Sequence, residues 1–418
     1  MRLKFHSTVE AVKNTYNTLL CSGGAVIIYH NNELQVEQYW GTQSDKAHAR
    51  DVQGDTKFHI ASCRKSYIGF AVAYAVKNGF IKSIDDEVNE YLPVDKRNSL
   101  FKGMTIRHLI THSHGLSQAN GEIVRDFAPG TSWAYKGINI DILSDIIKHT
   151  TKQSIADILH EQVFTPLGFS ETGWYNTFDE TFVEVIRGDR DKHWYESSNT
   201  DGSVMNMYVS ARELAKWGLL HLNNGLVNGE QVVDAEILQT EVFTPLGFNE
   251  TGWYNTFDET FVEVIRGDRD KHWYESSNTD GSVMNMYVSA RELAKWGLLH
   301  LNQGKVNGEQ IVDADVLALA TTFQSPSFTD SNLPENGFLW FVKNSEVTRS
   351  EIGEIVPNGS YQILGYTTVT LLVIPSENIV AVRAFNSFGN PPGYDYLRDV
   401  KDFGNRIMQD LQEKESEN

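Results

Sequence analysis

The sequence lacks the long apolar runs that cross a membrane: no stretch approaches the roughly 18 uninterrupted apolar residues that a spanning helix needs. The first seven residues, Met1-Arg-Leu-Lys-Phe-His-Ser7, also lack the apolar core of a secretory signal. Cysteine is scarce. The 418 residues contain 2 cysteines, Cys21 and Cys63, which suits a reducing compartment, although many exported bacterial enzymes have as few. We therefore expect a cytoplasmic chain with no transmembrane segment and two unpaired cysteines.

Clusters of basic residues are also missing. The 36 lysines and arginines are outnumbered by 55 aspartates and glutamates, which gives a formal net charge of −19, and the two signs are interspersed. A phosphate backbone is bound by a basic patch, so we expect no nucleic-acid partner. The remaining composition, 40% apolar and 22% charged, is ordinary for a globular protein.

One block of the chain is repeated. Val163-Phe-Thr-Pro-Leu-Gly-Phe169 recurs as residues 242–248, 79 positions further on, and residues 171–223 match residues 250–302 without a mismatch. Solenoid repeats usually come in threes or more, with drifted sequences and distinct caps. Two nearly identical copies therefore indicate a recent tandem duplication rather than a solenoid.

We interpret residues 1–418 as a single domain with tandem copies at residues 163–241 and 242–320. Without the extra copy the domain would have about 340 residues, and we expect the repeat to add no new chemistry. An assembly error in the source sequence would give the same pattern. Because one copy alone can fill a given place in the core, the other should pack as a surface lobe or stay partly unfolded.

Two β-hairpins are predicted, one near each end of the chain. Residues 24–29 and 34–39 flank an Asn-containing turn, and the β-branched runs 367–375 and 379–385 are joined by a short polar segment. Strands from both ends imply one antiparallel sheet that is built from the two termini.

Helices are predicted between and after these hairpins. Residues 66–76 are apolar on most sides and predict a buried helix, and residues 394–411 predict a final one. Residues 100–320 should be mostly helical, with helices at 138–147 and 211–222. The expected fold class is α/β (α+β): an antiparallel sheet flanked by helices, with a mostly helical lobe that carries the duplicated block.

Ser62-Cys-Arg-Lys65 is a Ser-x-x-Lys element that stands just before the predicted buried helix. If a helix begins at Ser62, both side chains lie on one face of its first turn, where Lys65 can take the hydroxyl proton. The helix N-terminus would favour the developing anion. The bare pattern is weak, because Ser99-Leu-Phe-Lys102 matches it in an apparent loop, and a serine helix cap followed by a solvated lysine would look the same.

Lys65 can serve as a base only in its uncharged form. A lysine acts as a base at neutral pH only if burial or a nearby cation lowers its pKa. The apolar helix that follows offers such burial.

A longer series of segments resembles one known family. Phe58-His-Ile-Ala-Ser-Cys-Arg-Lys65 is followed by Asn78-Gly-Phe-Ile-Lys-Ser-Ile-Asp-Asp86, Tyr91-Leu-Pro93 and Met104-Thr-Ile-Arg-His-Leu-Ile-Thr-His-Ser-His-Gly-Leu116. In this order the segments resemble the serine β-lactamase-like and penicillin-binding-protein family, in the branch with class C β-lactamases, DD-carboxypeptidases, esterases and 6-aminohexanoate oligomer hydrolases. The resemblance implies a β-lactamase/transpeptidase-like fold, with Ser62 as nucleophile and Lys65 as base.

The second element that the resemblance implies is Tyr-x-Asn, and Tyr135 matches its tyrosine. A phenol or tyrosinate near Lys65 could relay the proton to the leaving group. Gly137 occupies the position of the family's asparagine, so the amide that steers substrate is missing. Asn139 would substitute only if the loop is shifted.

The third implied element is Lys- or His-Thr/Ser-Gly, and its best match is Gly359-Ser-Tyr361, which carries no cation. The loss of that cation weakens the case for substrates with a carboxylate, such as β-lactams or D-Ala-D-Ala ends. A backbone N–H near Tyr361 or Gln362, together with that of Ser62, should form the oxyanion hole.

His112-Ser-His114 could hold zinc in principle, but the sequence has no further cluster of His, Cys and carboxylate residues beside it. We expect no metal and no cofactor.

The expected function is hydrolysis of a small-molecule ester or amide through an acyl-enzyme on Ser62. The weak second and third elements favour an esterase or small-amide hydrolase over a β-lactamase or DD-peptidase. The alternative is a non-catalytic ligand-binding or sensor module on the same fold. The sequence leaves the acyl donor and the oligomeric state open.

Overall fold

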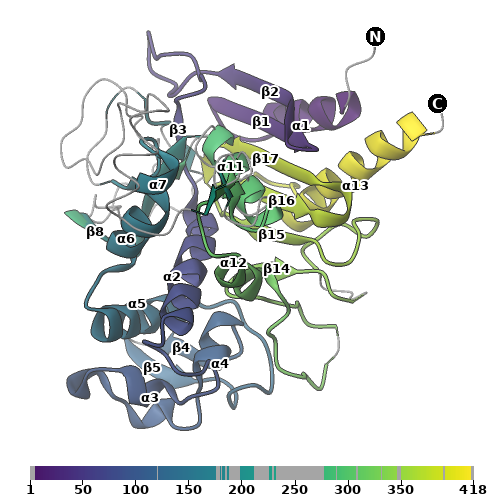
Figure 1. Cartoon of the computed structure of the whole chain (residues 1–418). Coiled ribbons are helices and arrows are strands. Elements are labelled where there is room, and N and C mark those ends of the chain that lie inside the picture. The colour runs from purple at the N-terminus through teal and green to yellow at the C-terminus, as the bar shows by residue number, and fades with distance from the viewer. Residues whose placement is uncertain are drawn as a thin grey trace.

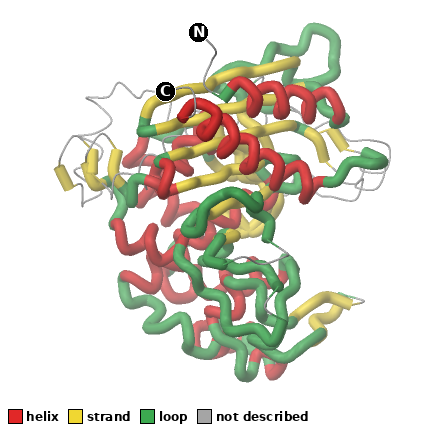
Figure 2. Tube along the Cα trace, turned by 90° about the vertical axis from the view of Figure 1, so that its right-hand side faces the viewer, coloured by secondary structure: helices red, strands yellow, loops and turns green. Residues whose placement is uncertain are grey.

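A sheet covered by helices forms one part of the molecule, and a largely helical part adjoins it (Figures 1 and 2). No helix in the described part of the chain is long and apolar enough to cross a membrane. The computed structural model describes residues 5–119, 121–175, 179, 181–183, 186–187, 198–210, 226–227, 230–231, 277–288, 290–306, 309–330, 332–345, 350–388 and 391–415.

The main sheet has six antiparallel strands in the order β14-β15-β16-β17-β1-β2. Both predicted hairpins are present, and β1 pairs with β17, so the two ends of the chain build one sheet, as expected. The strands are β1 (Gly23–His30), β2 (Glu33–Gly41), β14 (Phe341–Val342), β15 (Tyr361–Leu364), β16 (Thr370–Ile374) and β17 (Ile379–Phe385).

Helices cover both faces of this sheet. Helices α1 (His6–Thr18) and α13 (Tyr396–Glu415) pack together on one face, and α11 (Ala290–Leu301) lies against β1, β16 and β17 on the other. Alternate residues of β1 divide between two cores: Ala25 and Ile27 join the α11 side, whereas Val26 and Ile28 join the α1 and α13 side. This alternation explains why β1 reads as a continuous apolar run.

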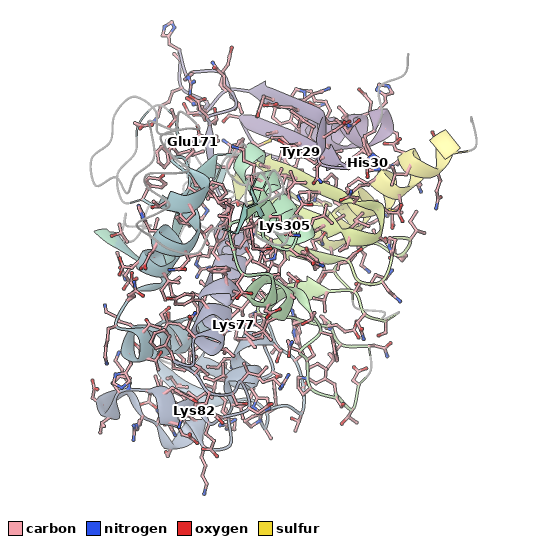
Figure 3. The ribbon with its side chains drawn as sticks, viewed as in Figure 1. Tyr29, His30, Lys77, Lys82, Glu171 and Lys305 are labelled. Carbon is pink, nitrogen blue, oxygen red and sulfur yellow. The ribbon has the colours of Figure 1, made fainter. Side chains whose placement is uncertain are left out.

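The helical part is centred on α2 (Lys65–Lys77), which is buried over most of its length as predicted. At its C-terminal end Lys77, labelled in Figure 3, forms ion pairs with Asp315 at 2.6 Å and Asp313 at 3.4 Å. The other helices of this part are α3 (Val88–Tyr91), α4 (Ile106–Ile110), α5 (Ile138–Thr151), α6 (Ile155–Leu159), α7 (Thr165–Leu167) and α12 (Ala314–Thr321).

The expectation of a mostly helical middle region overlooked a second sheet, in the order β11-β3-β8-β6. Its long strands β8 (Ser198–Ser210) and β11 (Ser277–Val288) come from equivalent places in the two copies and pair in parallel. The paired residues are equivalent except at Val283, which pairs with Met205 where the register shifts. The shorter strands are β3 (Lys57–His59) and β6 (Gly173–Trp174). The predicted helix 211–222 lies outside the described residues.

Both copies of the repeat contribute to the core. The first copy buries Val163, Phe164 and Trp174, and the second buries Leu293 and other side chains of α11 and α12. In the second copy Trp296 stacks on Tyr67 of α2 at 3.9 Å between ring centroids, and its Nε1 donates to Ser66 Oγ at 2.8 Å. Among the described residues, therefore, neither copy supplies the core alone.

Candidate active site

Ser62 lies on a strained turn rather than in the first turn of an α-helix. Residues Ala61–Arg64 form a 3₁₀ turn, and α2 begins at Lys65, so the prediction of a helix start at Ser62 is corrected. In a 3₁₀ turn residues i and i+3 lie one above the other, so the spacing still aligns Ser62 with Lys65. Ala61 has a positive φ of 46°, which L-residues rarely adopt outside functional or tight-turn sites.

Lys65 joins the other two predicted catalytic side chains. Its Nζ donates to Ser62 Oγ at 2.8 Å and to Tyr135 OH at 2.9 Å. Ser62 and Lys65 are 8% and 3% exposed, so water barely reaches their contact. The structure thus brings together the three residues that the sequence singled out from two separate segments.

The environment of Lys65 disfavours its charged form. Burial is the main cause, and the neighbouring buried cation Arg64 adds to it; together they hold the pKa of Lys65 well below 10.5. Arg64 is itself 4% exposed, and burial lowers its pKa to about 9. A neutral lysine amine beside a serine hydroxyl is competent to accept the hydroxyl proton.

Tyr135 is 41% exposed, but its hydroxyl contacts the buried Lys65. Burial raises the pKa of Tyr135 to about 12 and outweighs the opposite effects of Ser62 and Arg64. The side chain is therefore a protonated phenol at neutral pH, not a tyrosinate, and it suits a group that passes a proton onward.

His112 is a site residue that sequence reasoning missed. Its ring stacks on Tyr135, with 4.6 Å between the centroids and 29° between the planes. It is 1% exposed, and burial and Lys65 hold its pKa well below 6.5, so the ring is neutral. The signal was present in the His112-Ser-His114 pair, which we weighed only as a zinc site.

The two histidines do not converge. His114 Nδ1 accepts from the backbone N–H of Leu116 at 3.0 Å, whereas His112 faces Tyr135. Within the residues that the structure describes, no group of three or more potential metal ligands comes together.

Asn139 does not take the place of the missing substrate-steering amide. It is fully buried, and its Nδ2 donates to the carbonyl of Leu109 at 2.9 Å and lies 3.4 Å from His112 Nδ1. Its contacts hold the segment that carries His112. Gly137 caps the start of α5 and is exposed, and a Cβ added there would meet nothing within 4 Å.

Strand β15 packs against the Ser62 turn, and Gly365 at its end makes the closest approach. A Cβ at Gly365 would collide with the carbonyl oxygen of Ile60 and lie 3.3 Å from Cys63 Sγ. No side chain fits between the strand end and the turn, so the backbone of Gly365 lies directly against the backbone of Ile60.

The register of β15 determines toward which neighbouring strand each of its backbone N–H groups points. Gly365 N donates to Val369 O, so odd-numbered residues of β15 face β16 and even-numbered residues face the opposite edge. Tyr361 therefore faces β16, and Gln362 is paired with Phe341 of β14. Leu364 faces the same edge as Gln362 but lies beyond the end of β14.

Comparison with known proteins identifies the family. The sequence profile described as Beta-lactamase matches residues 19–236 and 234–404, two stretches that adjoin inside the duplicated block. The chain belongs to the beta-lactamase family. Homologues in this family are serine hydrolases, and the match confirms the β-lactamase/transpeptidase-like fold that the sequence predicted.

Relatives within the beta-lactamase family differ in what they are described to do. An uncharacterized protein of Alkalihalophilus pseudofirmus is 44% identical over 405 residues, covering 97% of this chain and 96% of its own. Esterase EstB of Burkholderia gladioli is 27% identical over 196 residues, covering 38% of this chain and 49% of its own. The match thus spans about half the length of that esterase.

Solved structures of beta-lactamase type share the fold across nearly the whole chain. A beta-lactamase/D-alanine carboxypeptidase from Yersinia pestis complexed with citrate has a TM-score of 0.59 and 14% identity, with 97% of this chain and 98% of that chain covered. EstCE1, a hydrolase with promiscuous acyltransferase activity, has a TM-score of 0.58 and 16% identity, with 96% and 98% covered.

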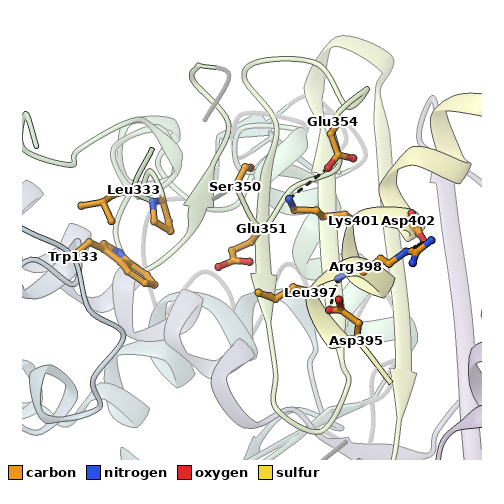
Figure 4. A pocket seen from close by; sticks show the side chains of 11 residues that line it. Trp133, Leu333, Ser350, Glu351, Glu354, Asp395, Leu397, Arg398, Lys401 and Asp402 are labelled. Carbon is orange, nitrogen blue, oxygen red and sulfur yellow. Dashed lines mark hydrogen bonds and ion pairs between the residues drawn. The ribbon is translucent and has the colours of Figure 1, made fainter. Parts of the chain in front are cut away.

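A pocket of about 750 Å³ lies beside Tyr135 in this beta-lactamase-family chain (Figure 4). Trp133 forms one wall, and its ring centroid is 6.2 Å from that of Tyr135. The opposite wall is contributed by α13 and by the segment around Glu351.

Proposed function

We propose that this protein is an esterase or small-amide hydrolase that works through an acyl-enzyme on Ser62. The observation that carries the proposal is the contact of Lys65 Nζ with both Ser62 Oγ and Tyr135 OH. Spacing alone would not require these three polar groups to meet, and the burial of Ser62 and Lys65 costs free energy that a structural role does not explain.

In the first step Ser62 Oγ attacks the substrate carbonyl and its proton passes to the neutral amine of Lys65. The carbonyl oxygen becomes an oxyanion, held by the backbone N–H groups of Ser62 and Leu364. Leu364 replaces Tyr361 and Gln362 in this role, because the backbone groups of those two residues are engaged in the sheet.

In the second step the tetrahedral intermediate collapses and the bond to the leaving group breaks. Tyr135 donates its phenolic proton to the leaving oxygen or nitrogen and recovers a proton from the ammonium of Lys65. Water then attacks the acyl-enzyme along the reverse proton route, which releases the acid and restores Ser62. Every proton that leaves Ser62 is therefore returned, and no cofactor is needed.

The third family element supports a substrate without an essential carboxylate. Gly359-Ser-Tyr361 has no cation, and Lys343, which follows the end of β14, is 2% exposed. Lys343 Nζ donates to the carbonyls of Gly353, Glu354 and Val356 at 3.2, 2.7 and 2.8 Å. A lysine held by three carbonyls serves the fold and is not placed to hold a substrate carboxylate.

The test is intact-mass spectrometry after incubation with a fluorophosphonate, which labels an activated serine. We expect one adduct on the wild-type chain, none on Ser62→Ala, and an unchanged adduct on Ser99→Ala. Ser99 is the matched control because it begins the second Ser-x-x-Lys pattern on an exposed turn. A folded wild-type chain that takes up no label would rule out the hydrolase and leave the binding module.

A further inference from the structure

The pocket beside Tyr135 combines an aromatic wall with carboxylates. Trp133, Leu333, Pro334 and Leu397 provide its apolar surface. Trp133 is fixed in place, because its Nε1 donates to Asn336 Oδ1 at 2.8 Å. A flat indole face held in this way is a surface on which a cation can rest.

The two cations of the pocket wall are already paired. Lys401 Nζ lies 3.5 Å from Glu354 Oε1, and Arg398 Nε lies 3.9 Å from Asp402 Oδ2. Neither is positioned as a free site for an anionic substrate group. The pocket therefore does not offer the carboxylate recognition that its position beside the active site would otherwise suggest.

These ion pairs leave two carboxylates in the pocket wall. Asp395 Oδ1 accepts from the backbone N–H of Arg398 at 3.1 Å, and Glu351 is the other. Its main chain is held by Gln362 of β15, whose Nε2 donates to Glu351 O at 2.9 Å. Across the described residues, no hydrogen bond or ion pair reaches its side-chain oxygens, and Figure 4 draws that side chain between Trp133 and Leu397. A carboxylate anchored by its backbone and left without a partner faces the space where a ligand would lie.

The pocket also lies on the leaving-group side of the reaction. Tyr135 is the residue that hands its proton to the leaving group, and Trp133 is its neighbour both in sequence and in space. A substituent on the departing alcohol or amine would extend past Tyr135 toward Trp133 and Glu351.

We propose that this pocket binds a positively charged ammonium group on the leaving group, so that the favoured substrates are esters or amides of amino alcohols or diamines. The inference rests on the proposed function. Glu351 supplies the opposite charge and Trp133 the ring face, and both act on specificity without taking part in bond cleavage.

The test uses pairs of esters that differ only in charge. Acetates of ω-(trimethylammonio)alkanols with two to six carbons are compared with acetates in which the quaternary nitrogen is replaced by carbon. We expect the wild-type ratio of kcat/KM, cationic over neutral, to exceed one and to fall about tenfold in Glu351→Gln. Protection of Ser62 from the fluorophosphonate by the same compounds gives the corresponding ratio of binding affinities.

A surface carboxylate on α3 provides the matched control. Glu90→Gln removes the same formal charge from an exposed position in the helical part and should leave the ratio unchanged. A ratio that is equal in the wild type and Glu351→Gln, or a wild type that prefers the neutral ester, overturns this inference but not the hydrolase. Absence of both ester cleavage and Ser62 labelling overturns the proposed function itself.

The pH dependence gives a second readout. Burial raises the pKa of Glu351 to about 7, against the opposing effect of Lys401. The carboxylate is therefore ionised mainly above neutral pH. The preference for the cationic ester should grow as the pH rises from about 6 to about 8, and Glu351→Gln should abolish this growth. A preference that is flat over this range contradicts the assignment to Glu351.

Discussion

The chain contains the Ser-x-x-Lys pattern twice, and the two places differ in burial and in the backbone that follows the pattern. Ser62 and Ser99 both lie in 3₁₀ turns. At Lys65 the backbone stays helical, with φ −62° and ψ −27°, so the side chain returns over Ser62. At Lys102 it turns away into an extended conformation, with φ −58° and ψ 130°. The backbone after the motif, more than the spacing within it, decides whether the two side chains meet.

The segments Ser62–Lys65 and Ser99–Lys102 also differ in burial. Lys65 is enclosed by the apolar core and contacts Tyr135, whereas Ser99 and Lys102 are exposed. Strand β15 also closes over the Ser62 turn. The proposed base, the proposed proton relay and a neighbouring strand thus surround one of the two motifs, and the predictions below remove these parts one at a time.

Loss of the base should have the largest effect. Lys65→Ala is expected to slow fluorophosphonate labelling of Ser62 by about 10³-fold, because the proton of the attacking hydroxyl has no acceptor. Lys102→Ala, in the exposed motif, should label at the wild-type rate. Equal slowing of the two variants, read from the time course of adduct mass, would show that Lys65 is not the base.

Removal of the Tyr135 hydroxyl, the proposed proton relay, should reduce activity less than loss of Lys65. Tyr135→Phe keeps the ring that stacks on His112 but loses the hydroxyl, and we expect a drop of about 10²-fold in kcat. The drop should be larger for an amide than for a nitrophenyl ester, since nitrophenolate leaves without a proton. Steady-state kinetics on one ester and the matching anilide measure this. The same loss on both substrates would assign Tyr135 to positioning alone.

Displacement of strand β15 from the Ser62 turn should have the next largest effect on the labelling rate. In Gly365→Ala the new methyl group meets Ile60 and must push β15 away from the Ser62 turn, so we expect about a tenfold loss in labelling rate. Gly297→Ala is the control: its methyl group crowds Leu371 and Val380 in the core, 2.4 Å from each, without touching the turn. Both are measured below their melting temperatures. A wild-type rate for Gly365→Ala would contradict the oxyanion assignment to this strand end.

The smallest expected effect is that of Lys65 on the free energy of unfolding. Because Lys65 binds its proton more weakly in the folded chain than in the unfolded one, the unfolded chain holds more protons between the lowered pKa and 10.5. Stability should therefore rise with pH across that window. Lys65→Met should be more stable than the wild type at pH 7, by about 1 kcal/mol, with the pH slope reduced. Lys102→Met should change neither quantity in urea unfolding at several pH values.

Much of the fold and of the candidate site could be predicted from local sequence patterns. The hairpins at the two ends and the buried helix after Ser62 follow from short-range periodicity, and the final helix differs only at its ends, Tyr396–Glu415 instead of 394–411. Ser62, Lys65 and Tyr135 could be chosen because each belongs to a longer resemblance in which neighbouring residues agree.

What could not be predicted depends on contacts between distant segments. Tyr361 and Leu364 lie on one strand, and which of them faces the Ser62 turn depends on the register with β14 and β16. Asn139 and His112 are buried against each other by the packing of α5, so the first is structural and the second supports Tyr135. A one-residue change of face is invisible in a sequence and reverses a role.

The composite core has a consequence for how the gene can change. Residues 171–223 and 250–302 are identical, so excision of any 79 consecutive residues that begin within 171–224 yields the same shorter polypeptide. One such excision joins Ser210 to Ala290. It keeps the core residues that the first copy supplies before this point and those that α11 and α12 supply after it, and it leaves Ser62, Lys65 and Leu364 in place. Removal of 79 residues at any of these positions thus gives one and the same shorter chain, and that chain keeps Ser62, Lys65 and Tyr135.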